Sequence, residues 1–212
     1  MNYQDKQPTI VLGSGGHAGV VIETLRELDF KILGLIDPQK KSGEKYCGIE
    51  VLGDDYSIKK FDPKTIKLAN GVGSLPDVTD RWRVAKNFRS LGYEFVTIIH
   101  PATVVSESAS IEEGVQIMAG SVLQNSISIG QDTIINTGSI IDHNCQIGSN
   151  CHIAPGVVIS GNVKIGSGSH IGTGAQIIQN IEIGGDTVIA AGAVVYKNIP
   201  AGSNFIQSLK EK

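Results

Sequence analysis

The 212-residue sequence lacks the features of a membrane or secreted protein. It has no run of eighteen apolar residues, and its first residues, MNYQDKQPT, show no basic segment followed by an apolar stretch. We therefore expect no membrane-spanning helix and predict a cytoplasmic protein. The net charge of -3 disfavours nucleic acid or an anionic membrane surface as a partner.

Cysteine is also scarce. Cys47, Cys145 and Cys151 form an odd set without a CxxC motif. Such a set favours neither a disulfide framework nor a metal site, so we expect no bound metal. Cys145 and Cys151 lie six residues apart within a repeat described below, where buried thiols behave as small hydrophobic side chains.

Positive charge is scarce in the C-terminal half, because fourteen of the eighteen Lys and Arg residues precede position 106. This shift in composition marks a boundary between two parts of the chain. We predict one domain over residues 1–100 and a second over residues 101–212.

An aliphatic residue recurs at every sixth position from Ile111 to Val195, fifteen times without a break and thirteen times as isoleucine. Neither helical spacing nor the alternation of an amphipathic strand has this period. A six-residue unit holds one short strand and a tight corner, so it buries its aliphatic residue only by stacking on other units. Small or apolar residues four positions further on share this inward role: Val115, Ser121, Thr133, Cys145, Val157, Val163, Ala175 and Thr187.

Three units close one triangular coil of eighteen residues, which brings residues eighteen apart into register at roughly 4.8 Å, the spacing of strands in a sheet. The fifteen units predict about five coils and a prism with three flat faces. Glycine frequently follows the aliphatic residue, and we attribute this to backbone that turns tightly or takes a positive φ. The glycines concerned are Gly130, Gly148, Gly166, Gly172 and Gly184.

The N-terminal part begins with the pattern of a nucleotide-binding βαβ unit. Residues 9–12 predict a buried strand, and the glycine-rich segment 13–19 opens a helix that runs to about Leu28. A second strand is predicted over residues 30–36, and the acidic Asp37 follows it about twenty positions after the glycines. Glycines let backbone N–H groups and the helix N-terminus approach a phosphate closely.

The remaining N-terminal segments predict a short strand at 49–52, a third main strand at 66–72, a helix at 77–91 and a fourth strand at 94–99. Four parallel strands in about a hundred residues correspond to half of a dinucleotide-binding fold. A nucleoside-diphosphate ligand therefore fits the available length better than a whole NAD molecule.

The units IGSNCH, IGSGSH and IGGDTV resemble those of the left-handed β-helix acyltransferases. The glycine-rich start, combined with a prism that contains NTGSIIDHNCQIG, resembles the group of sialic acid O-acetyltransferases and UDP-4-amino-sugar N-acetyltransferases. This match spans nearly the whole chain. It implies an α/β, Rossmann-like domain that binds a nucleotide sugar, followed by a left-handed parallel β-helix that uses acetyl-CoA.

His143 is the candidate catalytic residue. It lies two positions after an inward isoleucine, at an outward place that we expect on a flat face, and imidazole is the usual base for an incoming amine or hydroxyl. The family pattern implies that His143 is this base and that the next residue is usually acidic. Here the next residue is Asn144, whose amide adds no charge, so either Asp142 supports the imidazolium or the base is weaker.

The same resemblance implies an acetyl-CoA-binding groove at His152, Thr173 and Ala191. For His152 the alternative is a surface ladder with His170, which lies eighteen residues further on. In the N-terminal domain the resemblance implies substrate-binding residues of the phosphate loop and the nucleoside site, where Pro38 leaves the base preference open: Gly15, Gly16, His17, Asp37, Pro38 and Gly73.

These inferences predict an acetyl-CoA-dependent N-acetyltransferase acting on the 4-amino group of a nucleotide-linked amino-deoxy sugar in surface glycan biosynthesis. Direct transfer is expected, because no cysteine or serine nucleophile stands out. The family also implies a homotrimer with acetyl-CoA between neighbouring prisms. The alternatives are a sialic acid or other sugar O-acetyltransferase, an NAD-dependent reductase, a non-enzymatic scaffold, and a zinc lyase of the carbonic-anhydrase type using His143, His152 and His170.

Overall fold

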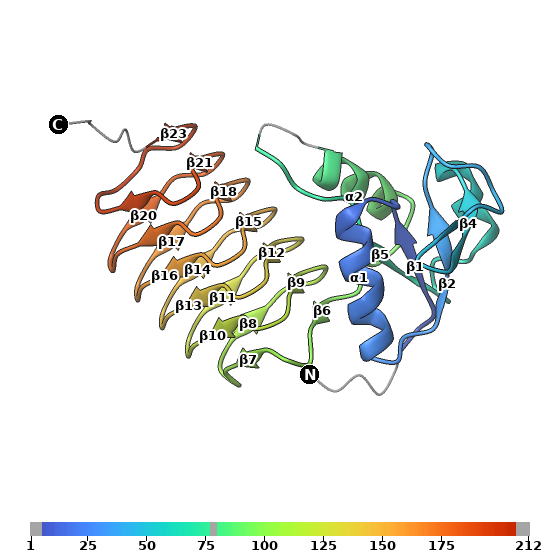
Figure 1. Ribbon diagram of the computed structural model, residues 1–212, viewed down its shortest axis with the longest axis horizontal. Coiled ribbons are helices and arrows are strands. Elements are labelled where there is room, and N and C mark those ends of the chain that lie inside the picture. Colours follow the sequence, from blue (N-terminus) through green and yellow to red (C-terminus); the bar gives the residue numbers. More distant parts are fainter. Residues whose placement is uncertain (1–5, 77–79, 207–212) are drawn as a thin grey trace. The chain divides into compact units, whose positions relative to one another are not determined.

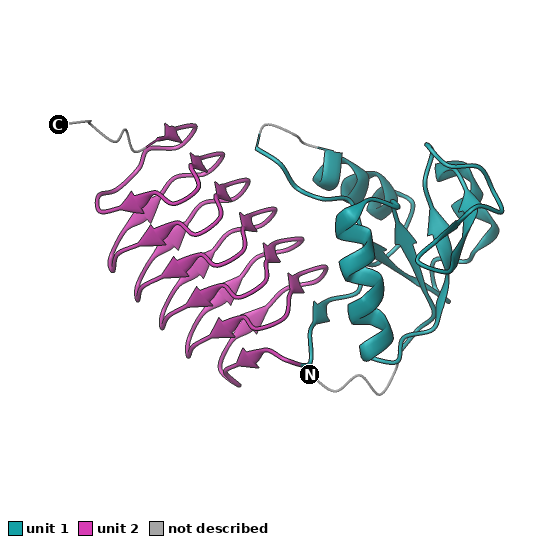
Figure 2. Cartoon of the chain, in the orientation of Figure 1, with its two compact units in different colours: residues 1–101 teal, residues 102–212 magenta. Residues whose placement is uncertain are grey.

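The computed structural model describes residues 6–76 and 80–206, and the chain divides into two compact units, residues 1–101 and 102–212 (Figure 2). The first unit is a sheet with helices, and the second is a stack of short strands in successive coils (Figure 1). None of the helices within the described ranges has the length and apolar character needed to cross a bilayer.

The first unit is built on a five-stranded sheet of order β3-β4-β2-β1-β5. Its strands β1, β2, β4 and β5 run parallel, while β3 and β4 form an antiparallel hairpin. The strands predicted near 9–12, 30–36, 49–52 and 66–72 are therefore confirmed. Their observed bounds, with β3 added, are β1 Thr9–Leu12, β2 Ile32–Ile36, β3 Lys45–Tyr46, β4 Ile49–Gly53 and β5 Lys67–Asn70.

Helices enclose this sheet. Helix α1 (Gly16–Glu27) buries one apolar stripe and contacts β1 and β5, as the predicted βαβ start requires. The 3-10 helix η1 (Asp55–Lys60) follows β4, and α2 (Asp80–Ser90) follows β5. The first residues of the predicted helix 77–91 lie outside the described residues. Ile10, Leu12, Leu68 and Phe88 belong to the core cluster between these elements.

The predicted fourth strand at 94–99 is formed only in part. Phe95 forms one isolated parallel bridge with Leu68, and the segment ends in the two-residue strand β6 (Ile98–Ile99). Leu68 N–H donates to the carbonyl of Glu94 at 2.9 Å, and Val96 N–H donates to the carbonyl of Leu68 at 2.8 Å, so the segment pairs with β5 around one residue. This pairing does not extend into a full strand.

The second unit consists of strands of two residues each, arranged in three parallel sheets. Within this unit the sheets have the orders β22-β19-β16-β13-β10-β7, β20-β17-β14-β11-β8 and β23-β21-β18-β15-β12-β9. The predicted repeat corresponds to the fifteen strands β8 to β22, which form five coils. The bounds are β7 Val104–Val105, β8 Ser110–Ile111, β9 Gln116–Ile117, β10 Val122–Leu123, β11 Ser128–Ile129, β12 Ile134–Ile135, β13 Ile140–Ile141, β14 Gln146–Ile147, β15 His152–Ile153, β16 Val158–Ile159, β17 Lys164–Ile165, β18 His170–Ile171, β19 Gln176–Ile177, β20 Glu182–Ile183, β21 Val188–Ile189, β22 Val194–Val195 and β23 Asn204–Phe205.

Residues eighteen apart pair across neighbouring coils, as in Ile135 with Ile153 and Ile153 with Ile171. The eight inward positions predicted four residues after an aliphatic residue are all 0% exposed. Polar members of this set are tolerated because their hydroxyls find backbone acceptors. For example, Ser121 Oγ donates to the carbonyl of Asn136 at 3.0 Å, and Thr133 Oγ1 donates to that of Gly148 at 2.8 Å.

The explanation given for the glycines after the aliphatic residues is wrong. None of the five has a positive φ. A Cβ added at any of them would lie 2.3 to 2.5 Å from a backbone nitrogen of the next coil, so these glycines permit close stacking. Positive φ occurs instead two residues later, at every sixth position from Gly114 to Gly192, where glycine, asparagine, aspartate and one serine stand.

Candidate active site

The six substrate-binding residues predicted in the N-terminal domain line one cavity of about 750 Å³ within the first unit. They come from the loop after β1 and the first turn of α1, from the residues directly after β2, and from the loop after β5. The carboxyl ends of parallel strands form the usual ligand crevice of an open α/β sheet, so strand topology explains why distant residues meet here. The six are Gly15, Gly16, His17, Asp37, Pro38 and Gly73.

The N-terminus of α1 opens into this cavity. Gly15 is the N-cap residue, and a Cβ on Gly15 or Gly16 would meet no atom within 4 Å. Tyr46 Oη donates a hydrogen bond of 2.9 Å to the carbonyl of Gly15, which fixes the turn. Gly13 has φ +87°, a conformation that favours glycine. The helix end therefore offers backbone N–H groups and a positive dipole to an anion.

Close packing brings the loop after β5 against this helix. A Cβ on Gly71 would lie 2.6 Å from the carbonyl oxygen of Leu12 and 2.7 Å from Cβ of Ala18. A Cβ on Gly73 would lie 3.7 Å from Cβ of His17. Glycine at position 71 thus lets two walls of the cavity approach each other.

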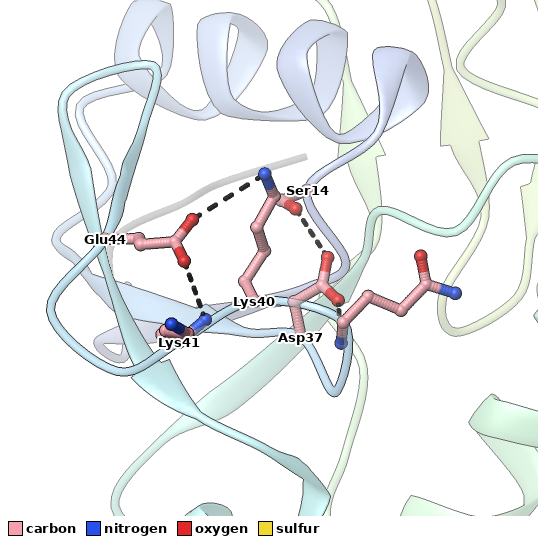
Figure 3. A network of polar contacts seen from close by, with 6 residues as sticks. Ser14, Asp37, Lys40, Lys41 and Glu44 are labelled. Atoms are coloured by element: carbon pink, nitrogen blue, oxygen red, sulfur yellow. Dashed lines mark hydrogen bonds and ion pairs between the residues drawn. The ribbon is translucent and has the colours of Figure 1, made fainter.

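The carboxylate of Asp37 lines the cavity. It is held in a network of polar contacts (Figure 3). Its Oδ2 accepts a hydrogen bond of 2.5 Å from Ser14 Oγ, and its Oδ1 accepts one of 2.8 Å from the backbone N–H of Gln39. Beyond it, Glu44 lies 3.7 Å from Lys40 Nζ and accepts from the backbone N–H of Lys41 at 3.1 Å. The first two bonds orient Asp37, whereas the exposed ion pair contributes little energy.

Several residues that were not predicted from the sequence line the same cavity, among them Asp55, Asp80 and Arg83. Partial burial raises the pKa of Asp55 above its ordinary value, and the charges of Asp54 and Asp37 raise it further. Asp55 follows β4, so the rule about strand ends could have found it. Arg83 lies on α2, where it pairs with Asp80, and no local sequence signal singles it out.

His143 is exposed, but it does not lie on a flat face as predicted. It occupies the turn between β13 and β14, where the chain passes from one sheet to the next. The backbone N–H of His143 donates to Asp142 Oδ1 at 2.8 Å, so this carboxylate holds the turn. The imidazole rests on Gly161 of the following coil, where an added Cβ would lie 2.5 Å from Cε1.

Asn144 has a structural reason for its identity. Its φ is +60°, it stands at one of the periodic positive-φ positions, and its N–H donates to the carbonyl of Asn125 at 3.1 Å. Asparagine and aspartate adopt this left-handed conformation more readily than other residues with side chains.

His152 and His170 form the ladder considered as an alternative reading of His152. They pair on β15 and β18 with ring centroids 4.8 Å apart and ring planes at 90°. His152 Nε2 also lies 3.2 Å from Asn136 Nδ2, which orients the ring. These contacts do not test the acetyl-CoA-binding role of His152, which stays a prediction.

Thr173 and Ala191 are exposed and stand on successive coils at one corner, between β18 and β19 and between β21 and β22. His143 stands at a different corner of the prism, between β13 and β14. The structure therefore brings Thr173 and Ala191 together but does not bring them to His143 within one chain. Searched over the described residues, no group of three or more His, Cys, Asp or Glu side chains could hold a metal.

Residues 9–88 match the family described as the PglD N-terminal domain, and residues 126–161 match the bacterial transferase hexapeptide family of six repeats. A search of curated protein sequences gives no match.

Solved structures resemble the chain over nearly its whole length. A histidine variant of perosamine N-acetyltransferase from Caulobacter crescentus, in complex with CoA and GDP-perosamine, is 33% identical with a TM-score of 0.85, covering 92% of this chain and 91% of that one. The acetyltransferase domain of PglB from Neisseria gonorrhoeae FA1090, in complex with acetyl coenzyme A, is 31% identical with a TM-score of 0.85 and coverages of 94% and 97%. WeeI from Acinetobacter baumannii AYE is 25% identical with a TM-score of 0.81 and coverages of 92% and 93%.

The chain belongs to the family of left-handed β-helix sugar acetyltransferases that these structures represent. It is an acyltransferase, its β-helix is left-handed, and the predicted fold class is confirmed. The reductase, the scaffold and the zinc lyase do not fit these relatives.

Proposed function

We propose that this chain transfers the acetyl group of acetyl-CoA to the 4-amino group of a nucleotide-linked amino-deoxy sugar, in the cytoplasm, for surface glycan biosynthesis. The observation that carries this proposal is the likeness, over 92% of the chain, to an N-acetyltransferase bound to CoA and GDP-perosamine. That relative and its name favour an amine over a hydroxyl as acceptor.

The cavity of the first unit supports a nucleotide sugar as acceptor. The diphosphate lies at the N-terminus of α1, where open backbone N–H groups of Gly15 and Gly16 and the helix dipole favour negative charge. Asp37, already oriented by Ser14 and Gln39, accepts hydrogen bonds from the nucleoside. Pro38, Gly73 and His17 form the surrounding wall.

His143 acts as the general base. As the sugar amine attacks the thioester carbonyl, His143 takes a proton from nitrogen and the new C–N bond forms. The C–S bond then breaks, and the CoA thiolate leaves with the proton that the His143 imidazolium returns. The exposed ring at a rigid turn supports this role, because it is accessible and its backbone is held by Asp142. Asn144 supplies the turn geometry beside it.

Acetyl-CoA lies along His152, Thr173 and Ala191, and the active assembly is a homotrimer. The positions of Thr173 and Ala191 support this arrangement, because they stand at a corner of the prism away from His143 and a neighbouring chain can bring the two sets together. Sedimentation is expected to give three chains per particle, and a monomer at micromolar concentration would contradict the trimer.

A thiol-release assay with acetyl-CoA tests the function. The acceptors are UDP-, GDP- and dTDP-linked 4-amino-4,6-dideoxy sugars, with free and CMP-linked sialic acid as hydroxyl acceptors. Rapid release with one amino-sugar nucleotide is expected and identifies its base. Thiol release with sialic acid alone would show that the acceptor atom is oxygen. No release with any acceptor of the panel would refute the proposal that the acceptor is a nucleotide-linked amino sugar of this type.

A further inference from the structure

The His143 imidazole packs against the next coil of the prism. Gly161 lies eighteen residues after His143, and its buried backbone lies beneath the imidazole. A Cβ added at Gly161 would lie 2.5 Å from Cε1, 2.6 Å from Nε2 and 3.0 Å from Nδ1 of that ring. No side chain fits at position 161 while the ring keeps this orientation.

The turn itself does not demand glycine at this position. The equivalent turn residues one coil before His143 and one coil after Gly161 are Asn125 and Gln179. The same coil-to-coil hydrogen bonds occur throughout, with Asn162 N–H donating to the carbonyl of His143 at 2.9 Å and Asn180 N–H to that of Gly161 at 3.1 Å. The φ of Gly161 also lies outside the left-handed region, so alanine is compatible with its backbone.

We propose that Gly161 is a positioning residue for the catalytic base. Because it lacks a side chain, the His143 imidazole packs directly on its backbone, and this contact fixes the direction of the ring nitrogens. This inference rests on the proposed role of His143. A side chain at position 161 displaces the His143 ring from the Gly161 backbone, and a displacement of about 1 Å costs on the order of a hundredfold in rate.

Gly161→Ala tests this inference, with Gln179→Ala as the matched control at the same corner. We expect a fall in kcat of about tenfold or more, an unchanged KM for acetyl-CoA, and a control with wild-type values. In the resting protein, the NMR signals of the His143 ring, assigned by their loss in His143→Ala, are expected to shift in Gly161→Ala and to stay in place in Gln179→Ala. Unshifted ring signals together with wild-type kcat would overturn the proposal.

A second measurement covers loss of folding and separates the two hypotheses. If Gly161→Ala lowers the Tm, the double variant with His143→Ala is expected to recover the Tm of the single His143→Ala variant, because the colliding ring is gone. A Tm that does not recover would show that the backbone itself requires glycine at position 161, and this would refute the proposed role of Gly161 in positioning His143. If His143→Ala alone keeps full turnover, the general-base role fails, while the ring signals and the Tm still report on the contact.

Discussion

The side chains of Asn70 and Arg81 each bond to the backbone of the other residue. Asn70 Nδ2 donates to the carbonyl of Arg81 at 3.0 Å, and Arg81 Nη1 donates to the carbonyl of Asn70 at 3.0 Å and to that of Val72 at 2.7 Å. Asn70 Oδ1 also accepts from the N–H of Val72 at 3.1 Å. Both side chains are buried, so this clamp holds the loop that carries Gly73 into the cavity of the first unit.

Asn70→Ala is therefore expected to lower the free energy of unfolding by about 1–3 kcal/mol, because buried polar backbone groups lose their partners. The KM for the nucleotide sugar is expected to rise at the same time, while the KM for acetyl-CoA stays unchanged. Urea unfolding and steady-state kinetics measure these effects, with Lys86→Ala on the exposed side of α2 as control. A stability equal to that of the control would contradict the clamp.

His143→Ala is expected to reduce kcat by about two orders of magnitude or more, because it removes the group that accepts the amine proton. Acetyl-CoA binding, measured by calorimetry, is expected to stay at the wild-type level. His100→Ala in the other unit serves as a comparison for loss of a histidine, and turnover of His143→Ala equal to wild type would exclude the general base.

Two glycine substitutions are expected to have opposite consequences. Gly16→Ala places its Cβ in open space at the start of a helix, so the Tm is retained while the KM for the nucleotide sugar rises about tenfold, because the phosphate loses close access to the backbone. Gly148→Ala places its Cβ 2.5 Å from the backbone nitrogen of Ser167, so its Tm falls. Thermal unfolding and kinetics distinguish them, and a stable Gly148→Ala protein would refute the stacking argument.

Asn144→Asp is expected to fold normally, since aspartate tolerates the positive φ at this position. The added carboxylate next to His143 stabilises a protonated imidazole, so the acidic limb of the kcat/KM profile is expected to move to higher pH. Asn144→Gly keeps the turn without the charge and is the control. Superimposable profiles for all three proteins would argue against electrostatic support of the base from this position.

Burial raises the pKa of the Cys151 thiol from its ordinary value of 9.0 to about 11. Between these values the unfolded thiol ionises while the folded one stays neutral, so stability falls as pH rises from 9 and the loss levels off above about 11. The shift of two units corresponds to about 3 kcal/mol. Urea unfolding from pH 8 to 10.5 is expected to show a weaker decline for Cys151→Ala than for wild type, and parallel declines would contradict this assignment.

Much of the prism could be predicted from the sequence, because each six-residue unit repeats one local rule. The inward aliphatic residues and the small residues four positions later are buried as expected. Position 161 is eighteen residues after His143 and so stands one coil further on, but the period alone does not tell which turn residues touch. Glycines such as Gly148 were attributed to the wrong cause, because close stacking and positive φ both favour glycine and the sequence does not distinguish them.

The lining of the cavity in the first unit could be predicted in part. Gly15, Gly16 and Asp37 belong to a motif whose spacing reflects how a strand, a turn and a helix bind phosphate. The roles of Ser14 and Arg83 could not be predicted in this way. Ser14 donates to Asp37 and Arg83 lines the cavity only because distant segments of the chain pack together. The segment near Phe95 was predicted as a full strand, because its apolar composition does not reveal that it pairs with β5 around a single residue.

Local spacing alone predicts the repeat, the inward residues of the β-helix and the glycine-rich start of the first unit, because these depend on motif spacing and on burial of periodic side chains. The contact of the His143 ring with Gly161 and the hydrogen bond from Ser14 to Asp37 become visible only in three dimensions. The physical reason is that contacts between coils and between strand ends are set by packing in three dimensions, which no single stretch of the chain encodes.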